Sequence, residues 1–113
     1  MNGRLERSER LRKKSEYLKA LRGRKCEGRL IAVYRSRNDL EAIRFGFITG
    51  KKVSKKAVER NRLRRLMKEF CRRNKDLFPS GNDFVLRALP EANKVSYNEI
   101  CDEIRRILEK IAA

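Results

Sequence analysis

Residues 51–66 are Lys-Lys-Val-Ser-Lys-Lys-Ala-Val-Glu-Arg-Asn-Arg-Leu-Arg-Arg-Leu, and the periodicity of the chain changes within this block. Before it, Ile43, Phe45 and Phe47 alternate with other residues, which predicts a strand over residues 43–49. From about residue 54 to residue 73, apolar residues recur at helical spacing, at Leu63, Leu66, Met67, Phe70 and Cys71. The chain is therefore expected to pass from a strand into a basic helix.

Two further elements are predicted on the N-terminal side of this block. A helix is expected over residues 11–22, where Ser15 can cap the regular part and Gly23 can end it. Residues 29–35 are apolar on both faces of a strand, so this strand is expected to be central. We predict that it pairs antiparallel with the strand at 43–49. Within that second strand, Gly46 suggests a bulge or a close approach of another chain segment.

On the C-terminal side, residues 83–89 are predicted to form a strand and residues 96–111 a helix. Ser96 and Glu99 fit a capping box at the start of that helix, and its apolar residues line one face. The neighbouring Asp102 and Glu103 are expected on the solvated face. The predicted order is α-β-β-(β)-α-β-α, with one strand optional. It indicates a single α+β (α/β two-layer) domain over residues 1–113, a small sheet packed by helices, with residues 1–10 as a flexible basic segment.

The charge of the chain is high and unevenly distributed. Its 113 residues carry a net charge of +16, and residues 51–75 contain twelve Lys and Arg against two Glu. Arg60, Arg64 and Lys68 recur every four residues, a spacing at which like charges repel in a helix. An anionic ligand would offset this repulsion, so the pattern predicts binding to a polyanion, most simply RNA.

Several other classes of protein are disfavoured by the composition. The chain has no His for a nucleophilic triad and no phosphate-binding glycine motif, and its acidic residues are scattered. We therefore expect no catalytic residue, no metal site and no organic cofactor. Cys26, Cys71 and Cys101 lack CxxC spacing, which favours free thiols in a reducing cytoplasm. Neither a secretory signal nor a membrane-spanning segment is expected.

The basic block also carries a family resemblance. The segment Ala57-Val58-x-Arg60-Asn61-Arg62-x-Arg64-Arg65 opens a basic helix after Lys51-Lys52-Val53. It resembles the RNR signature of the bacterial ribonuclease P protein component, with about a dozen positions agreeing in order. The resemblance extends over nearly the whole chain, through segments such as Arg44-Phe45-Gly46 and Asp83-Phe84-Val85.

This resemblance implies a fold, a function and partners. The fold would be an α/β sandwich with a left-handed βαβ crossover. The chain would be the protein subunit of ribonuclease P, a cytoplasmic endoribonuclease that removes the 5′ leader of precursor tRNA. Its partners would be the ribonuclease P RNA, which carries the chemistry and holds most of the Mg²⁺, and precursor tRNA. No protein oligomer would be required.

The resemblance also assigns residues to two sites. The set that would bind the catalytic RNA is Lys51, Lys52, Lys55, Lys56, Arg60, Asn61, Arg62, Arg64 and Arg65. The cleft for the precursor-tRNA leader would contain Tyr17, Leu21, Arg29, Tyr34, Arg64 and Lys68. Leu21 stands where the family often has Phe, so it offers no aromatic face to a base.

Simpler interpretations remain for some of these residues and for the function. Tyr17 and Leu21 can equally pack the first helix, and Tyr34 can be a residue at the edge of the core. A ribosomal protein or an assembly factor would share the size and the charge. A DNA-binding module is less well supported, because neither a helix-turn-helix nor a zinc pattern is present.

Overall fold

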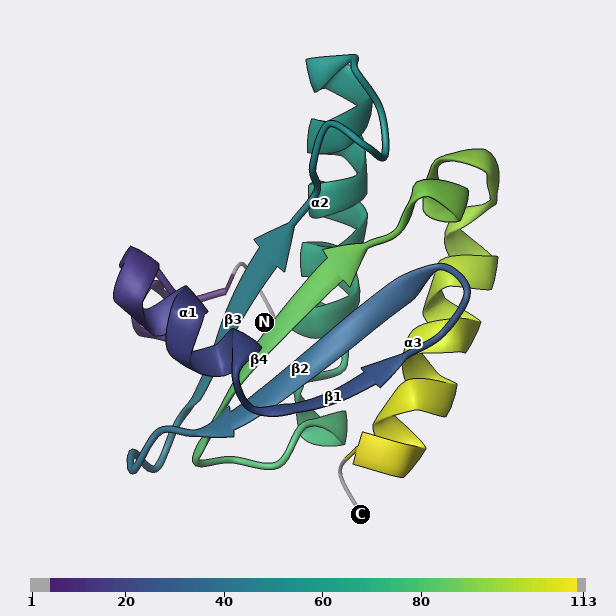
Figure 1. The fold of residues 1–113 in the computed structure, drawn as a ribbon. Coiled ribbons are helices and arrows are strands. Elements are labelled where there is room, and N and C mark those ends of the chain that lie inside the picture. Colours follow the sequence, from purple (N-terminus) through teal and green to yellow (C-terminus); the bar gives the residue numbers. More distant parts are fainter. Residues whose placement is uncertain (1–4, 112–113) are drawn as a thin grey trace.

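A computed structural model of the protein describes residues 5–111, and Figure 1 shows its helices and strands. The main elements, in chain order, are α1 (Lys14–Leu21), β1 (Arg24–Glu27), β2 (Ile31–Arg37), β3 (Ile43–Ile48), α2 (Ala57–Arg73), β4 (Asn82–Ala88) and α3 (Tyr97–Ile111). Short 3-10 helices lie at Arg7–Glu9, Lys75–Leu77 and Pro90–Lys94. The predicted α+β class and element order are confirmed, with the optional strand present. Within the described residues no helix is long and apolar enough to cross a membrane.

The strand that periodicity did not locate is β1. It follows α1 directly and pairs antiparallel with β2 at the edge of the sheet, with Cys26 opposite Val33. Its sequence, Arg-Lys-Cys-Glu, contains a single apolar residue and therefore lacks the alternation by which a strand is recognised. Only its partner, β2, defines it as a strand.

The predicted pairing of the strands at 29–35 and 43–49 is wrong. The sheet order is β1-β2-β4-β3, so β4 lies between β2 and β3. It pairs antiparallel with β2 and parallel with β3. The physical reason lies in β4 itself, because Phe84, Val85 and Leu86 are fully buried and point to alternating faces. A strand that is apolar on both faces needs neighbours and cover on both sides, which an edge position does not give.

The connection from β3 through α2 to β4 is a left-handed crossover. In Figure 1 both strands run upward, β4 lies to the right of β3, and α2 passes behind the sheet. Right-handed connections dominate among βαβ units, so this feature is unusual. The handedness that the family resemblance implied is therefore present.

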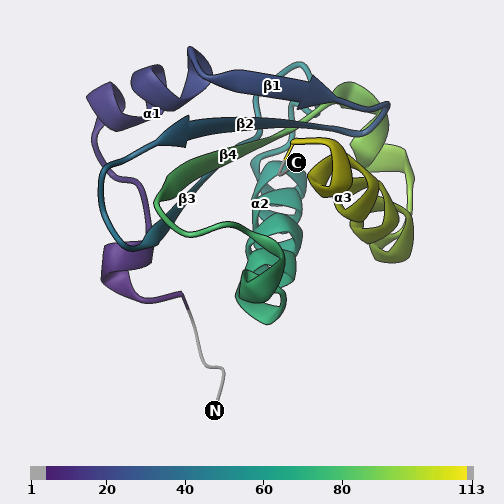
Figure 2. The same cartoon turned by 90° about the horizontal axis from the view of Figure 1, so that it is seen from below.

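Two apolar clusters lie on opposite faces of the sheet. Helices α2 and α3 cover one face, and α1 lies on the other (Figure 2). The larger cluster, under α2 and α3, contains Phe45, Phe78 and Phe84 with ring centroids 4.9 and 5.0 Å apart in edge-to-face pairs. The smaller cluster includes Ala20, Ala32 and other residues under α1. Because α1 is short, it leaves part of its face of the sheet uncovered.

Gly46 makes the close approach that its position in β3 suggested. A Cβ atom built at this residue would lie 2.5 Å from the ring of Tyr17. Only glycine lets the α1 tyrosine rest directly on the β3 backbone, and this contact fixes the height of α1 above the sheet.

The capping predictions had mixed outcomes. In α3, the Ser96 amide donates to Glu99 at 3.0 Å and the Glu99 amide donates to Ser96 Oγ at 3.3 Å, so the capping box is confirmed. In α1, Ser15 is not the cap, because the helix begins at Lys14. The amides of Arg12 and Lys13 both donate to Glu16 Oε1 at 2.9 Å instead. These bonds hold the pKa of Glu16 below its ordinary value.

The N-terminal segment, predicted to be flexible over residues 1–10, is packed where the structure describes it. Leu5 is buried in the larger cluster, and Lys75 pairs with Glu9 at 2.9 Å. The Leu11 amide donates to the Phe45 carbonyl at 2.8 Å, next to the edge of β3. Residues 1–4 lie outside the described part of the chain. The segment thus covers the outer edge of β3, which would otherwise be exposed.

Glu103 is not on the solvated face that the sequence predicted. It is only 5% exposed, while its neighbour Asp102 is exposed. Its carboxylate accepts the backbone amides of Arg29 at 3.0 Å, and of Leu30 and Ile31 at 2.6 Å each. The buried charge is stabilised because three donors from the turn before β2 surround it. Glu103 therefore anchors the β1–β2 hairpin to α3.

We expect Glu103→Ala to lower the free energy of unfolding by about 1–3 kcal/mol, because buried amides lose their acceptor. Asp102→Ala, on the exposed side of the same helix turn, should change it by less than about 0.5 kcal/mol. Urea denaturation followed by circular dichroism measures both values. Equal unfolding midpoints for the two variants would show that the amide contacts are not important for stability.

Candidate nucleic-acid interface

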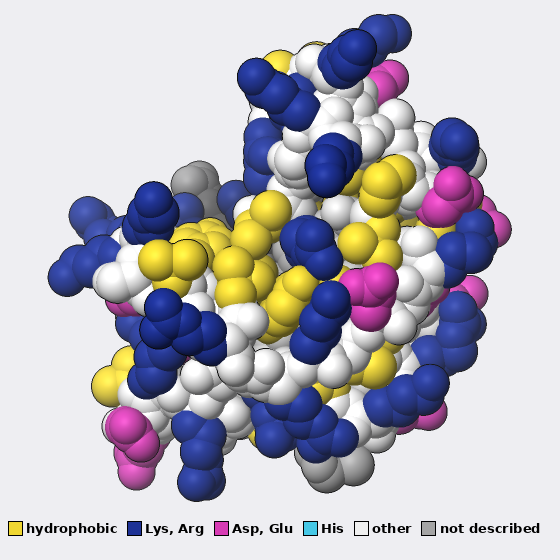
Figure 3. All heavy atoms as spheres, in the orientation of Figure 1, with side chains coloured by type: hydrophobic (Ala, Val, Ile, Leu, Met, Phe, Trp, Pro, Cys, Tyr) yellow, Lys and Arg dark blue, Asp and Glu magenta, His cyan; other side chains and the backbone are white. Residues whose placement is uncertain are grey.

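The N-terminal half of α2 projects beyond the sheet together with the turn that precedes it (Figure 1). Several Lys and Arg side chains lie on this projection in the space-filling view (Figure 3). The turn lysines are all exposed, namely Lys51, Lys52, Lys55 and Lys56. The structure therefore presents the predicted basic turn at the most protruding part of the described chain.

Arg60, by contrast, turns back toward the protein. Its Nη1 atom donates to the carbonyl oxygens of Ser54 and Lys55, both at 3.0 Å. The side chain is half-buried, so part of its donor capacity is used in holding the turn. Its predicted RNA contact stays a prediction, and its observed contacts are with the backbone that presents the lysines.

Glu59 holds the same turn from the other side. Ser54 Oγ donates to Glu59 Oε1 at 2.5 Å, and Asn93 Nδ2 donates to the same oxygen at 3.0 Å. These two hydrogen bonds hold the pKa of Glu59 below its ordinary value. The turn is thus tied both to α2 and to the short helix after β4. Its lysines therefore project from a turn that hydrogen bonds within the protein hold in place.

A groove of about 460 Å³ lies between the N-terminal segment, β3 and α2. It is lined by Arg10, Leu11, Tyr17, Phe45, Phe47, Asn61, Arg64, Arg65 and Lys68. One side is aromatic and the other is basic. An open groove of this composition suits a single strand of nucleic acid, because bases stack on rings while phosphates pair with cations.

Within the groove, the cations differ in how strongly the protein holds them. Arg64 Nη1 donates to the Thr49 carbonyl at 3.3 Å, and its Nη2 donates to Asn61 Oδ1. Arg65 and Lys68 are exposed, and no hydrogen bond or ion pair of their side chains is found among the described residues. Arg10, which also lines the groove, is exposed and likewise has no such contact among the described residues. These three cations can therefore bind a phosphate without first breaking an internal contact.

Tyr17 is held over the groove by an ion-pair cluster. Arg44 donates from Nε and Nη2 to the two carboxylate oxygens of Asp83, both at 2.8 Å, and from Nη1 to Glu16 at 3.0 Å. Asp83 is 1% exposed, so this bidentate pair is shielded from solvent. It joins α1, β3 and β4, and it places Tyr17 against Gly46. No local sequence pattern indicates this cluster.

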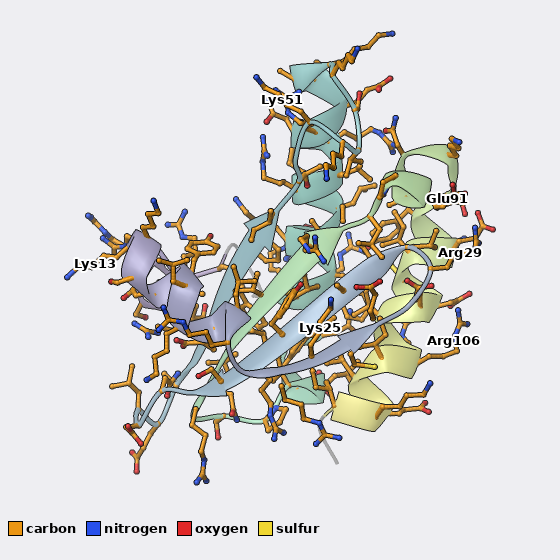
Figure 4. All side chains as sticks on the ribbon, viewed as in Figure 1. Lys13, Lys25, Arg29, Lys51, Glu91 and Arg106 are labelled. Carbon is orange, nitrogen blue, oxygen red and sulfur yellow. The ribbon has the colours of Figure 1, made fainter. Side chains whose placement is uncertain are left out.

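The remaining predicted leader residues lie elsewhere. Tyr34 and Leu21 belong to the smaller cluster on the sheet face beneath α1, where Tyr34 is 7% exposed. Arg29 lies at the β1–β2 turn, beside Glu91 and far from α1 (Figure 4), with 3.9 Å between the charged atoms. The structure therefore gathers Tyr17, Arg64 and Lys68 in one groove and places Arg29 away from it.

Two basic residues of the groove and the neighbouring sheet face are not among those that the sequence assigns to either site. Arg10 lines the groove, although the sequence predicts a flexible segment over residues 1–10. Arg87 lies on the central strand β4 and reaches the uncovered sheet face. One signal was available for it, since a single Arg within an apolar run such as Phe84-Val85-Leu86-Arg87-Ala88 marks an open part of a sheet face.

The described residues contain three free thiols and no cluster of candidate metal ligands. Between residues 5 and 111, no three Cys, Asp or Glu side chains are grouped so that they could hold a metal ion. Cys71 and Cys101 are buried and Cys26 is half-buried, all as free thiols. Burial raises the pKa of the Cys71 thiol well above its ordinary value, which makes it unreactive.

Comparison with known proteins places this chain in a family. A family model described as Ribonuclease P matches residues 5–112. The chain belongs to the ribonuclease P protein family. It is 36% identical over 107 residues to the ribonuclease P protein component of Syntrophus aciditrophicus, covering 94% of this chain and 89% of that protein. A second relative, from Pelotomaculum thermopropionicum, is 36% identical over 101 residues, covering 88% and 89% of the two chains.

Solved structures of ribonuclease P proteins have the same fold. The protein from Thermotoga maritima superposes with a TM-score of 0.80 at 27% identity, covering 91% of this chain and 97% of that one. The protein from Staphylococcus aureus gives a TM-score of 0.81 at 22% identity, covering 89% and 93%, and supports the fold alone. This chain is thus a protein component of ribonuclease P, an RNA-processing enzyme, and the ribosomal or assembly-factor alternative is not favoured.

The contacts of Arg60 lead to a prediction about the basic turn. Arg60→Ala should speed amide exchange at Val53 and Lys56 by roughly tenfold, because a charged donor to the turn carbonyls is lost. Arg65→Ala removes the same charge from α2 without a hydrogen bond to the turn and serves as the control. Hydrogen–deuterium exchange read by mass spectrometry distinguishes them. Similar exchange in both variants would mean that Arg60 does not hold the turn.

Proposed function

We propose that this ribonuclease P protein binds the catalytic RNA through its basic turn and the exposed cations of α2, and holds the precursor-tRNA leader in the groove beside them. The observation that supports this most directly is the groove itself, in which Tyr17 faces the basic side of α2. One side offers a ring to an unpaired base, and the other offers Arg65 and Lys68 to its phosphates.

The contact with the catalytic RNA would use the surface that projects furthest. Lys51, Lys52, Lys55 and Lys56 are exposed on an ordered turn, and Arg62 is exposed on the helix that follows. Compact lysine charges suit backbone phosphates, and an arginine can pair with a phosphate through two donors. Asn61 and Arg64 would complete this set, although in the free protein they bind one another.

The hydrolytic chemistry would belong to the RNA. Mg²⁺ is the metal proposed for this reaction, and the described residues offer no carboxylate cluster that fits it. We assign no step of bond cleavage to this chain. Its contribution would be to position the leader and to neutralise phosphates, as a single copy acting in the cytoplasm.

Reconstitution tests this function. The protein is mixed with a bacterial ribonuclease P RNA and a precursor tRNA at low Mg²⁺, and cleavage at the mature 5′ end should depend on the protein. Tyr17→Ala should lower the affinity gained from the leader by about fivefold or more, because stacking of a base contributes about 1–3 kcal/mol. Tyr17→Phe keeps the ring and should retain the gain. Equal binding of precursors with and without a leader by the wild-type complex would refute the leader assignment.

Salt dependence tests the phosphate contacts. Arg65→Ala should flatten the slope of log affinity against log salt for RNA binding by about 0.7 to 0.9, the value for one lost phosphate contact. Arg106→Ala, on α3 at the other side of the molecule (Figure 4), removes the same charge and should leave the slope unchanged. If the two slopes fall together, the effect is one of net charge, and Arg65 makes no specific contact.

A further inference from the structure

Four side chains from three strands meet on the same face of the sheet as α1, which covers only part of that face. Lys25 and Glu27 come from β1, Tyr34 from β2 and Arg87 from β4. The register places Lys25 opposite Tyr34 and places Ala32 between Glu27 and Arg87, so all four side chains point to the same face. Figure 4 shows Lys25 in front of the sheet, on the face opposite α2 and α3. We call this group the Arg87 cluster.

Within the Arg87 cluster, one carboxylate lies between two cations. Glu27 Oε1 is 2.9 Å from Lys25 Nζ and 3.8 Å from Arg87 Nη2. Both cations also lie over the ring of Tyr34, at 5.6 and 5.7 Å from its centre. The three charged side chains are 37–45% exposed, so a ligand from solvent can reach them.

Arg87 makes fewer hydrogen bonds to carboxylates than Arg44, the other arginine on this face of the sheet. Its distance of 3.8 Å to Glu27 is too long for a hydrogen bond. Its Nε atom is buried and has no hydrogen-bond partner among the described residues. A guanidinium presents five donors in a planar fork that matches the oxygens of a phosphate. The exposed donors of the Arg87 guanidinium are thus available to an anion, whereas its buried Nε atom is not.

The Arg87 cluster also adjoins the groove. In the sheet, Arg87 is opposite Ile48, the last residue of β3, and Val85 lies between Gly46 and Tyr34. Tyr17 rests on Gly46, so the aromatic side of the groove is two strands away from Tyr34, about 10 Å at the usual strand spacing. A strand of RNA that leaves the groove across β3 meets the cluster next.

We propose that Lys25 and Arg87 form a phosphate-binding site for the leader beyond the groove, and that Glu27 occupies this site as an internal competitor until RNA displaces it. The inference rests on the proposed leader function. Glu27 remains charged in the free protein, because the hydrogen bond from Lys25 holds its pKa below the ordinary value.

A tethered carboxylate changes which ligands can use the site. A free anion must displace Glu27 without help from other contacts. It therefore binds weakly, because the ion pair that it replaces is of similar strength. A phosphate joined to a nucleotide already held at Tyr17 has a high effective concentration and can displace the carboxylate. The site therefore responds to leaders long enough to reach from the groove to Arg87, and it ignores shorter ones.

The test compares the affinities of precursors with graded leader lengths for the reconstituted complex, with a leaderless tRNA as reference. Glu27→Gln should raise the affinity for long-leader precursors about two- to fivefold, since one exposed ion pair no longer competes. Binding of leaderless tRNA should not change. Glu109→Gln removes the same charge from an exposed position on α3 and should have no leader-dependent effect.

Substitutions of Arg87 should change the affinity for long-leader precursors in the opposite direction. Arg87→Gln should lower long-leader affinity and flatten its salt slope by about 0.7, whereas Arg87→Lys should keep the slope. If Glu27→Gln behaves like Glu109→Gln while the wild-type complex still prefers leaders, the competitor site is wrong and the groove assignment stands. A wild-type complex without any preference for leaders would overturn both.

Discussion

Strand β4 forms backbone hydrogen bonds on both of its edges, antiparallel to β2 and parallel to β3, and the arrangement of the whole molecule depends on this pairing. Its residues Phe84, Val85 and Leu86 pack into the clusters on both faces of the sheet. Because β4 enters between two strands that precede it in the sequence, β3 is pushed to the edge. The α2 helix that connects β3 to β4 then packs on the face of the sheet next to that edge, and the groove opens where α2, β3 and the N-terminal segment meet.

The cations near the core are paired with carboxylates, whereas many of those at the surface are exposed. Near the core, cations are paired, as in the contact of Arg44 with Asp83 and Glu16, and they serve to fix α1. Along the turn and the groove, Lys52, Arg65 and Lys68 stay exposed. Their mutual repulsion opposes folding of the free chain, and a bound polyanion would remove that cost. The same charges therefore lower the stability of the free protein and favour its assembly with RNA.

Ordering before binding is a common feature of the two surfaces. Glu59 and Arg60 hold the turn that carries the lysines, and Gly46 and Arg44 hold the helix that carries Tyr17. Binding of RNA to such a surface costs less conformational entropy, because the protein groups are already held in position. In the Arg87 cluster the internal partner is instead a carboxylate that a phosphate has to replace. The turn and the sheet face would then differ in which RNA ligands they select, and not only in their positive charge.

The sequence by itself determined the features that depend on near neighbours in the chain. These include the positions of α2 and α3, the capping box at Ser96 and Glu99, the close approach at Gly46 and the basic turn with its family signature. It did not determine which strands pair, and it missed β1, whose residues become a strand only beside β2. The surroundings of Glu103 and Arg87 were likewise not determined by the sequence. A local pattern cannot show that Glu103 accepts backbone amides or that Arg87 lies on a partly uncovered sheet face. Glu27 lies 60 residues from Arg87 and Arg29 lies 74 residues from Glu103 in the sequence, and only the tertiary structure brings them together.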